Sequence, residues 1–411
     1  MIVFIAPYSA ARRGSNRNLG ATRKIEFFLA MAARMTSNVV LVNTLHESTK
    51  WVPREVRKCT VGNVRIREIA LRRYPVRILG KFLNLLEVDA VSREVAQFGR
   101  PDAVWIYNAY AFEVMLARAL TRDFGARLIF QFDDWMLARR SLHPKPLIDF
   151  LAWRYLLPPP SVCLAVNDHV AAREHERSGR PVLPCPGVVS NELVAACAGR
   201  QPFQKPDSGR TVVGYFGGLW PEKGADLVLE LVKRSSGRFL FHVCGNGPLA
   251  DAFAEVSRLS GDVRFHGQVD DATLFDLIAE CDVLVNVHAS IEKMGNGVFP
   301  FKVVEYVASG RLVISTDLPP MSLHDVIEAV HFVAPRVESI QDALSDAPHL
   351  YAVKRQKIEK AMAVTRDMLS ANALEHAITS MLFGPQPSPD ERADDADAVK
   401  PNSNREEHRH A

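Results

Sequence analysis

The sequence predicts an α/β protein of two domains, each built around a parallel sheet. Short apolar runs of strand length alternate with segments of helical period along the 411 residues. A chain of this length can form two complete hydrophobic cores. The composition, with 47% hydrophobic and 24% charged residues, is that of a globular protein and excludes a mostly disordered chain.

The predicted strands are apolar runs bounded by turn residues or by segments of helical period. In the first half they are Ile2–Ala6, Val39–Asn43, Val64–Ile69, Val104–Tyr107, Leu128–Phe132 and Cys163–Val166. In the second half they are Val212–Phe216, Phe239–Val243, Val263–Phe265, Val283–Val287 and Leu312–Ser315. An amphipathic helix is predicted after the first run, because apolar residues recur there with helical spacing. They are Ile25, Phe28, Leu29, Ala32 and Met35.

Changes in composition divide the chain. Residues 1–197 are predicted to form the N-terminal domain, and the polar segment 198–210, which contains two prolines, is the predicted linker. Residues 211–352 form the predicted C-terminal domain, and helices over 353–384 close the fold. The tail 385–411 has few apolar residues to bury and is predicted to be disordered.

Charge is distributed unevenly between the two halves. Residues 1–196 contain 28 Lys and Arg against 17 Asp and Glu, whereas residues 197–411 contain 22 against 30. The segment Lys50–Lys81 alone has ten basic and two acidic residues. This segment is either a solvated face or a contact surface for an anionic partner, such as acidic lipid headgroups or a phosphate-bearing molecule. A nucleic-acid partner is not expected, since no nucleic-acid motif accompanies the charge.

The six cysteines are scattered and form no Cys-x-x-Cys pair. Most lie in apolar runs, which predicts buried, reduced thiols and a cytoplasmic protein. No signal peptide is expected, because the apolar start Met1–Pro7 is short and leads into a basic loop.

The first strand of the second half ends in a glycine-rich junction. Gly217 and Gly218 follow Phe216, and Lys223 precedes a predicted helix that starts at Ala225. Two glycines let backbone N–H groups approach a phosphate, and the start of a helix favours negative charge. An ordinary tight turn would also explain this pattern when it is taken alone.

Two further junctions follow strands of the same half. Gly245 and Gly247 lie within Cys244–Pro248, which is either a close-approach loop or a simple turn into a helix. In Phe299–Gly310, Lys302 could hold a phosphate and Glu305 could accept hydrogen bonds from a ribose. The alternative is an exposed i, i+3 pair worth about 0.2–0.5 kcal/mol. Because open α/β sheets bind ligands at the carboxyl ends of their strands, these junctions together predict a nucleotide-bearing ligand.

These motifs, in this order, make residues 212–317 resemble the nucleotide-binding domain of retaining GT-B glycosyltransferases. The resemblance implies two Rossmann-like domains that face each other across a cleft. It also implies transfer of a hexose from a nucleotide-diphosphate sugar to an acceptor hydroxyl, with retention of configuration. The landmarks are Gly217…Lys223-Gly224, Gly245-x-Gly247-Pro248, Phe265-His-Gly267-Gln-Val269, Cys281-Asp282-Val283 and Glu305-Tyr-Val-Ala308-Ser-Gly310.

The resemblance also implies roles for residues. Gly217 and Gly218, with Lys223 and Lys302, would hold the donor diphosphate, and the two lysines would stabilise the leaving group. Glu305 would bind the ribose hydroxyls. The base would lie near two segments, Gly245–Pro248, which includes Gly247, and Gln268–Leu274. The donor is a substrate, so no cofactor is expected, and no His, Cys or Asp spacing indicates a metal site.

The chain departs from the family pattern at several positions. Gly218 stands where the family often has Arg, and Gly297 stands where it often has a second Glu. Glu292 is a possible substitute for that Glu at a longer spacing. Many members have a His after an N-terminal strand, where this chain has Tyr107-Asn108.

The N-terminal half matches the family in layout more than in motif. The loop Arg12–Gly20 either faces the cleft, as the resemblance implies, or is a flexible surface loop. After the fifth strand, Asp134 or its neighbour Asp133 either meets the acceptor hydroxyl or caps a helix, and we assign Asp134 the catalytic role. His288 is a better candidate for the site than the other strand histidines, because it ends a strand in the cleft region.

The predicted activity belongs to surface polysaccharide or glycoconjugate biosynthesis. The predicted acceptor is a glycan or a lipid-linked molecule, and the basic N-terminal half suggests a peripheral position at the inner face of a membrane. Two alternatives stay open. One is a catalytically silent subunit that binds nucleotide-sugars, and the other is a nucleotide-sugar epimerase on the same fold.

Overall fold

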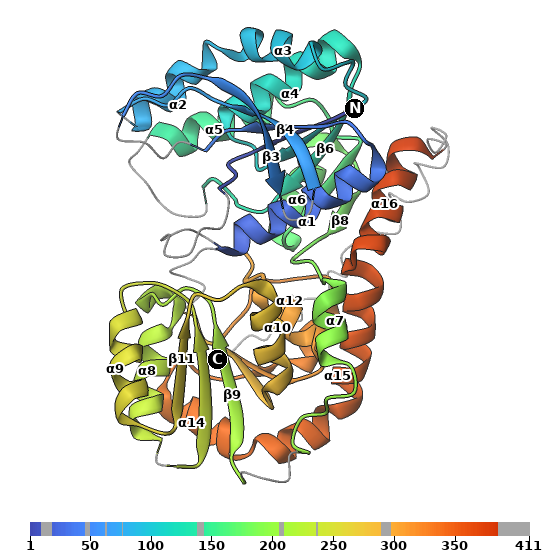
Figure 1. The fold of residues 1–411 in the computed structure, drawn as a ribbon. Coiled ribbons are helices and arrows are strands. Elements are labelled where there is room, and N and C mark those ends of the chain that lie inside the picture. Colours follow the sequence, from blue (N-terminus) through green and yellow to red (C-terminus); the bar gives the residue numbers. More distant parts are fainter. Residues whose placement is uncertain are drawn as a thin grey trace, which may run out of the picture.

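The computed structural model describes residues 1–9, 19–45, 50–61, 64–75, 77–137, 144–204, 209–235, 237–288 and 297–384. Two α/β domains lie one above the other, each with a central sheet flanked by helices (Figure 1). The predicted fold class, α/β with two parallel sheets, is confirmed.

The N-terminal sheet has the strand order β3-β4-β2-β1-β5-β6-β7-β8, and only the β3–β4 pair is antiparallel. The strands are β1 Ile2–Ala6, β2 Val39–Asn43, β3 Glu55–Val61, β4 Val64–Ala70, β5 Ala103–Tyr107, β6 Arg127–Phe132, β7 Val162–Ala165 and β8 Val182–Pro184. Two of them, β3 and β8, were not predicted. The first is a largely exposed, charged edge strand, and the second has three half-buried residues, so neither forms an apolar run.

The C-terminal sheet is parallel throughout, in the order β11-β10-β9-β12-β13-β14. Its strands are β9 Thr211–Phe216, β10 Phe239–Cys244, β11 Val263–Gly267, β12 Val283–Asn286, β13 Leu312–Ser315 and β14 His331–Phe332. The two-residue β14 is too short to show a pattern in the sequence. Strand order reverses between β9 and β12, and the carboxyl ends on either side of such a reversal are where open α/β sheets bind ligands.

Helices connect successive strands. In the first half they are α1 Leu19–Met35, α2 Arg77–Leu85, α3 Val88–Ala96, α4 Ala111–Phe124, α5 Pro144–Tyr155 and α6 Asp168–Ser178. In the second half they are α7 Asn191–Cys197, η1 Pro221–Lys223, α8 Ala225–Arg234, α9 Ala250–Leu259, α10 Asp271–Glu280, α12 Lys302–Ala308, α13 His324–Ala329, α14 Val337–Ser345, α15 Ala347–Leu369 and α16 Ala371–Phe383. The predicted amphipathic helix is α1, in which Phe28, Leu29 and Ala32 are buried.

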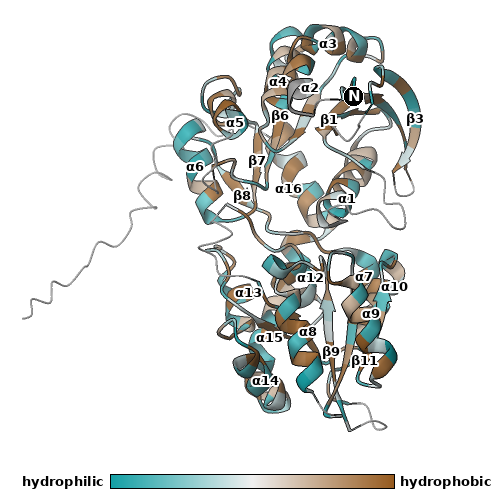
Figure 2. Cartoon of the chain, turned by 90° about the vertical axis from the view of Figure 1, so that its left-hand side faces the viewer, coloured by the Kyte–Doolittle hydropathy of each residue, from teal (hydrophilic) through white to brown (hydrophobic). Residues whose placement is uncertain are grey.

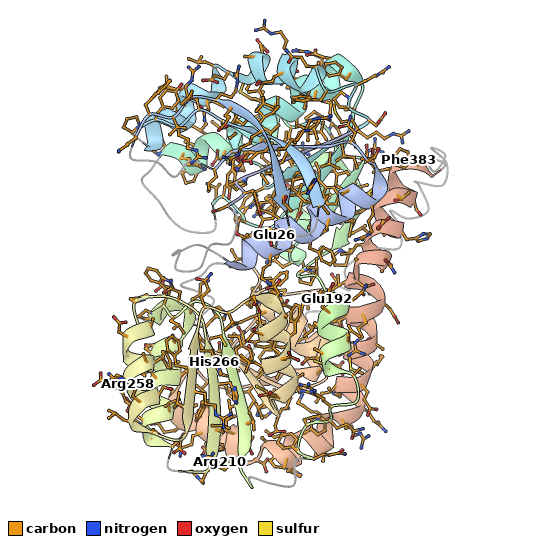
Figure 3. All side chains as sticks on the ribbon, viewed as in Figure 1. Glu26, Glu192, Arg210, Arg258, His266 and Phe383 are labelled. Carbon is orange, nitrogen blue, oxygen red and sulfur yellow. The ribbon has the colours of Figure 1, made fainter. Side chains whose placement is uncertain are left out.

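The chain passes between the domains twice. The first passage comes before α7, because α7 already packs against α10 of the C-terminal domain (Figure 1). This passage therefore lies before Asn191, ahead of the linker predicted at 198–210. The second passage follows α15, after which α16 returns to pack against α1 and β7 of the N-terminal domain. Phe383, at the end of α16, lies beside that domain (Figure 3).

The strands form the hydrophobic interior of both domains, while the exposed faces of many helices are polar (Figure 2). Five of the six cysteines are buried and Cys59 is half-buried. Within the described parts of the chain, no helix combines the length and hydrophobicity needed to cross a bilayer. The predicted tail, residues 385–411, lies outside the described residues.

Candidate functional site

The glycine junctions of the C-terminal domain are joined to one another at the carboxyl ends of β9, β10 and β11. The amide of Gly217 donates to the carbonyl of Cys244 at 3.0 Å, and the amide of Gly245 donates to the carbonyl of Gly267 at 2.8 Å. Gly245 has a φ of +147°, and a Cβ placed there would lie 1.8 Å from the Gly217 carbonyl oxygen. A side chain at Gly245 would therefore push the two turns apart. Packing between the turns explains this glycine before any ligand is considered.

Two lysines flank the turn after β9. The Nζ atom of Lys302 lies 3.7 Å from the position that a Cβ on Gly217 would take, and the Cγ atom of Lys223 lies 3.9 Å from the corresponding position on Gly218. The structure thus brings together four residues that the sequence assigned to the diphosphate. A pair of ammonium groups beside a glycine turn is suited to hold an anion.

Lys302 begins α12 and is half-buried, with Nζ 4.5 Å from the centroid of the Tyr215 ring. Burial, reinforced by the nearby charge of Lys223, lowers the pKa of Lys302 to about 7. At neutral pH this side chain is therefore close to losing its proton. An anion bound beside it would raise the pKa again and restore the positive charge.

His288 lies at the same edge, two residues beyond β12. It is buried, and neither ring nitrogen has a hydrogen-bond partner among the described residues. Burial, followed by the charges of Lys302 and Lys223, lowers its pKa well below the ordinary value, so the imidazole is neutral. A buried polar ring without partners indicates a place that a polar ligand can complete. By contrast, His242 and His266 stack on each other at 5.2 Å and bond at 3.1 Å.

Glu305, the predicted ribose ligand, is buried and paired with an arginine of the other domain. The Arg23 guanidinium, on α1, donates to both oxygens of Glu305, at 2.6 and 3.2 Å, and its Nε lies 2.9 Å from an Asp271 oxygen. Burial raises the pKa of Glu305, while the charge of Arg23 opposes that rise. A carboxylate has about four lone-pair sites, so this pairing leaves lone pairs on Glu305 that could accept further hydrogen bonds.

Sequence reasoning missed Arg23. It lies 282 residues from Glu305, and nothing in the pattern of α1 distinguishes it from a surface arginine. Glu26, three residues further along α1, lies at the face turned toward the C-terminal domain (Figure 3). Its position shows that this side of α1 belongs to the region between the domains.

The N-terminal edge of the site lies at the carboxyl ends of β5 and β6, where the two predicted aspartates differ in environment. Asp133 is buried and forms an ion pair with Lys24 at 2.7 Å. Asp134 is exposed, and its carboxylate accepts a hydrogen bond from Asn108 at 3.0 Å. Of the two, Asp134 is therefore the carboxylate that solvent can reach, and its catalytic role stays a prediction.

Asn108 links the ends of β5 and β6 through its side chain. It has a φ of +64°, uncommon for a residue with a Cβ, and is fully buried. Its side-chain oxygen accepts from the amides of Asp133 and Asp134 at 2.8 and 2.9 Å, while its side-chain nitrogen donates to the Asp134 carboxylate. At the place where many relatives have a His, this chain therefore has a residue that positions Asp134.

The environment of Asp134 also changes its acidity. Although solvent reaches the side chain, surrounding protein displaces much of the bulk water, and this desolvation with the charge of Asp133 raises its pKa to about 6. Lys24 and Lys223 act in the opposite direction. Because Lys223 belongs to the C-terminal domain, its charge acts on Asp134 from across the space between the domains.

Some predicted features cannot be placed. Glu292 and most of the loop Arg12–Gly20 lie outside the described residues. The carbonyl of Gly297 accepts a hydrogen bond from the Trp135 amide at 2.9 Å, so this position joins the domains through its backbone. Within the described parts of the chain, no group of three or more His, Cys, Asp or Glu side chains could hold a metal ion.

Comparison with known proteins supports the interpretation of the C-terminal half. Residues 210–347 match the family model described as Glycosyl transferases group 1. The C-terminal domain is therefore similar to the group 1 glycosyl transferases. The matched segment includes all the glycine junctions, both lysines, His288 and Glu305, so the C-terminal edge of the candidate site lies within it.

Curated relatives match this chain over part of its length. A phosphatidyl-myo-inositol mannosyltransferase of Mycolicibacterium smegmatis is 32% identical over 118 residues, covering 28% of this chain and 29% of that protein. The protein of the same name from Mycobacterium tuberculosis is 28% identical over 160 residues, covering 38% and 40%. The aligned parts thus span less than half the length of these relatives.

Solved structures resemble the whole chain. The Anabaena protein HepE in complex with UDP superimposes with a TM-score of 0.63 at 11% identity, over 93% of this chain and all of that one. Sucrose-phosphate synthase from Thermosynechococcus elongatus gives 0.62 at 16% identity, over 92% and 97%. The two-domain GT-B fold predicted for this chain is confirmed.

Proposed function

We propose that the protein transfers a sugar from a nucleoside diphosphate donor to an acceptor hydroxyl. The observation that carries this proposal is the placement of Lys223 and Lys302 beside the Gly217–Gly218 turn, at the carboxyl ends of parallel strands in a group 1 glycosyl transferase domain. The matched relatives are named as mannosyltransferases, and the HepE structures contain UDP or UDP-glucose.

The two lysines would stabilise the diphosphate leaving group. As the bond between the sugar and the diphosphate breaks, negative charge grows on the phosphate oxygens, and ammonium groups already in place lower the energy of that charge. Lys302, with a pKa of about 7 in the free protein, would take up a proton as the diphosphate binds. The unpaired ring of His288 would supply a further polar contact to the donor.

Glu305 would bind the ribose, and Arg23 would hold Glu305 in place from the opposite domain. The bidentate pairing fixes the carboxylate, so its remaining lone pairs point in defined directions. This arrangement couples the donor site to the approach of the N-terminal domain. Domain closure would also exclude water and protect the donor from hydrolysis.

Asp134 would meet the acceptor hydroxyl. Its raised pKa of about 6 leaves it ionised at neutral pH and able to accept a hydrogen bond from a sugar or lipid hydroxyl. No protein nucleophile is assigned, and we propose that the reaction retains the configuration of the transferred hexose. The two halves of the site would meet at Asp134 and Lys223.

The acceptor we propose is a glycan or a lipid-linked molecule, used in surface polysaccharide or glycoconjugate assembly at the inner face of a membrane. The excess of basic residues in the N-terminal half supports an anionic acceptor or surface. The matched relatives are named phosphatidyl-myo-inositol mannosyltransferases, and this name supports a lipid-linked acceptor.

A second candidate is a subunit that binds nucleotide-sugars without turning them over. It is favoured by the absence of side chains at Gly218 and Gly297 and by Asn108 in the place of a His. This candidate predicts donor binding with no loss of donor when acceptors are added. A nucleotide-sugar epimerase, the third possibility, would convert the donor without any acceptor.

The test is a donor screen by ligand-observed NMR with UDP-, GDP-, ADP- and dTDP-sugars. Wild type is compared with Glu305→Ala, Lys302→Ala and the surface control Lys233→Ala. Selective binding of one donor, weakened in the first two variants and unchanged in the control, supports the donor site. Acceptor-dependent release of the nucleoside diphosphate then identifies transfer, while binding without release identifies the silent subunit. If no donor binds to the wild type, the proposal is wrong.

A further inference from the structure

Exposed apolar side chains gather on one face of α5. Leu147, Leu151 and Tyr155 recur every four residues, and Leu156 follows directly. Leu147 is 54% exposed and Tyr155 is 72% exposed. We call these four residues the α5 ridge. Single exposed apolar residues are ordinary, but a continuous row on one helix face marks a surface that meets an apolar partner.

A cavity of about 330 Å³ opens beside the α5 ridge, between α5, α6 and the segment after β6. Its walls include Trp135, Phe150 and Trp153, and Trp135 packs edge-on against the other two rings, at 6.0 and 5.3 Å. The Trp153 indole donates to Glu174 of α6 at 2.8 Å, which fixes the wall between the helices. The cavity is therefore an open hollow whose aromatic walls are held in place by ring packing and one buried hydrogen bond.

Guanidinium groups line the same cavity. Arg177 is already engaged, because Glu174 binds it at 2.6 and 3.0 Å. Arg154 has no ion pair in the described parts of the chain. Arg173 has a long ion pair with Glu176, at 3.7 Å with both side chains exposed, and its guanidinium lies 5.8 Å from the centroid of the Trp135 ring. Arg154 and Arg173 therefore offer positive charge to an incoming anion.

The chemistry of the lining selects among ligands. A sugar site needs carboxylate or amide oxygens to accept hydrogen bonds from hydroxyls, and Glu176 is the one acidic side chain among the lining residues. Aromatic walls, arginines and an adjoining apolar ridge instead match a molecule that joins a phosphate to hydrocarbon. A phospholipid surface has this combination of charge and apolar area.

The basic segment Lys50–Lys81 is a weaker candidate for the same partner. Arg57 is paired with Glu68 at 2.9 Å, and Arg54 with Glu87 and Glu94 at 3.0 and 2.9 Å. Part of the charge that the sequence shows there is therefore neutralised within the fold. Beside α5 the two lining arginines lie next to the exposed ridge, and neither has an ion pair to a buried carboxylate in the described parts of the chain.

We infer that the α5 ridge and the adjoining cavity form a docking site for anionic phospholipid membranes. Arg154 and Arg173 hold the lipid phosphate, and the ridge leucines enter the layer between headgroups and acyl chains. Trp135 lines the cavity while its amide bonds to Gly297, and it directly follows Asp134, so the docked surface lies next to the interdomain site. This docking does not depend on the proposed sugar transfer.

The experiment is co-sedimentation of the full chain with vesicles of phosphatidylcholine alone or mixed with phosphatidylglycerol. We expect binding to the mixed vesicles that weakens with added salt. The double variants Leu147→Asp/Leu151→Asp and Arg154→Glu/Arg173→Glu should each lower the partition coefficient by about tenfold or more. All four side chains are exposed, so these variants should fold like the wild type.

Two controls make the result specific. Leu259→Asp changes a leucine that is 80% exposed on α9, and Lys58→Glu/Arg65→Glu reverses exposed charges on β3 and β4. Both should bind vesicles as the wild type does.

The inference is overturned if both vesicle types are bound equally, if the α5 variants bind like wild type, or if the β3–β4 variant alone loses binding. Concentration-dependent dimers that the leucine variant abolishes, with no vesicle binding, would assign the ridge to a second copy instead. Donor binding, followed by NMR, should be unchanged in all variants, so failure here removes the membrane docking and leaves the proposed donor site and sugar transfer untouched.

Discussion

The two edges of the candidate site are built in different ways. On the C-terminal edge, short junctions after successive strands bring glycines and lysines together. Each junction can be predicted from a few neighbouring residues of the sequence. On the N-terminal edge, Asp134 is positioned by Asn108, 26 residues away, and beside an ion pair that joins Lys24 to Asp133 across 109 residues. Motifs therefore identify the C-terminal edge, proposed to bind the donor, while the N-terminal edge, proposed to bind the acceptor, depends on contacts that no motif records.

The contact that crosses between the edges has the largest expected effect. Arg23→Gln would leave Glu305 without its buried partner and Asp271 without a neighbour, and breaking a buried ion pair costs about 3–5 kcal/mol. Denaturant unfolding measures this loss. The matched control is Arg34→Gln on the same helix, because Arg34 pairs with Glu375 at the surface and should cost less than about 1 kcal/mol. If both variants lost the same free energy of unfolding, the Arg23–Glu305 pair would contribute no more to stability than a surface ion pair.

The next effect tests the donor edge alone. Lys302→Ala removes an ammonium group beside the Gly217 turn, and loss of such a partner should weaken binding of a nucleoside diphosphate by about 2–4 kcal/mol. Calorimetric titration gives the affinity. Lys302→Arg keeps the charge and should retain most of the binding, whereas an unchanged affinity in Lys302→Ala would remove Lys302 from the site.

The acceptor edge is tested through Asn108. Asn108→Ala loses hydrogen bonds to the Asp133 and Asp134 amides and keeps a Cβ at positive φ, which should cost about 2–3 kcal/mol of stability. Asn108→Gly relieves the backbone strain and should recover about 1 kcal/mol. In both variants kcat should fall while donor affinity stays constant, since Asp134 is no longer held. A fall in donor affinity of the same size would contradict a role confined to the acceptor edge.

The smallest effect is a pH profile that separates the two edges. Asp134 has a pKa of about 6 and Lys302 of about 7. Activity should fall below pH 6 as Asp134 gains a proton, and donor binding should fall above pH 7 as Lys302 loses one, so kcat/KM forms a narrow bell. In the bound complex the phosphates raise the pKa of Lys302, which moves the alkaline limb of kcat upward.

Variants assign each limb of that profile. Asp134→Asn should remove the acidic limb along with most of the activity, and Lys302→Arg should remove the alkaline limb while leaving the acidic one. A profile that is flat from pH 5 to 9 would show that neither group titrates in the way its surroundings indicate.

Much of the fold could be predicted because its signals are local. Buried parallel strands are continuous apolar runs, and their ends agree with the structure to within one or two residues. The strands that were missed, β3, β8 and β14, are edge strands or very short ones and have no such run. The placement of α7 was missed for a related reason, since its sequence shows a helix but not the domain on which it packs.

The sequence alone therefore determined the two α/β domains, the order of the strands along the chain, and the glycine and lysine junctions at the donor edge. These follow from hydrophobic periodicity and from backbone conformations that few residues can adopt, and both are properties of neighbouring residues. Only the tertiary structure decided that Arg23 pairs with Glu305, that Asn108 positions Asp134, and that the α5 ridge stays uncovered beside an arginine-lined cavity. Those arrangements depend on how distant segments pack, because a buried charge must find its partner in space and an apolar face stays exposed only when no other segment covers it.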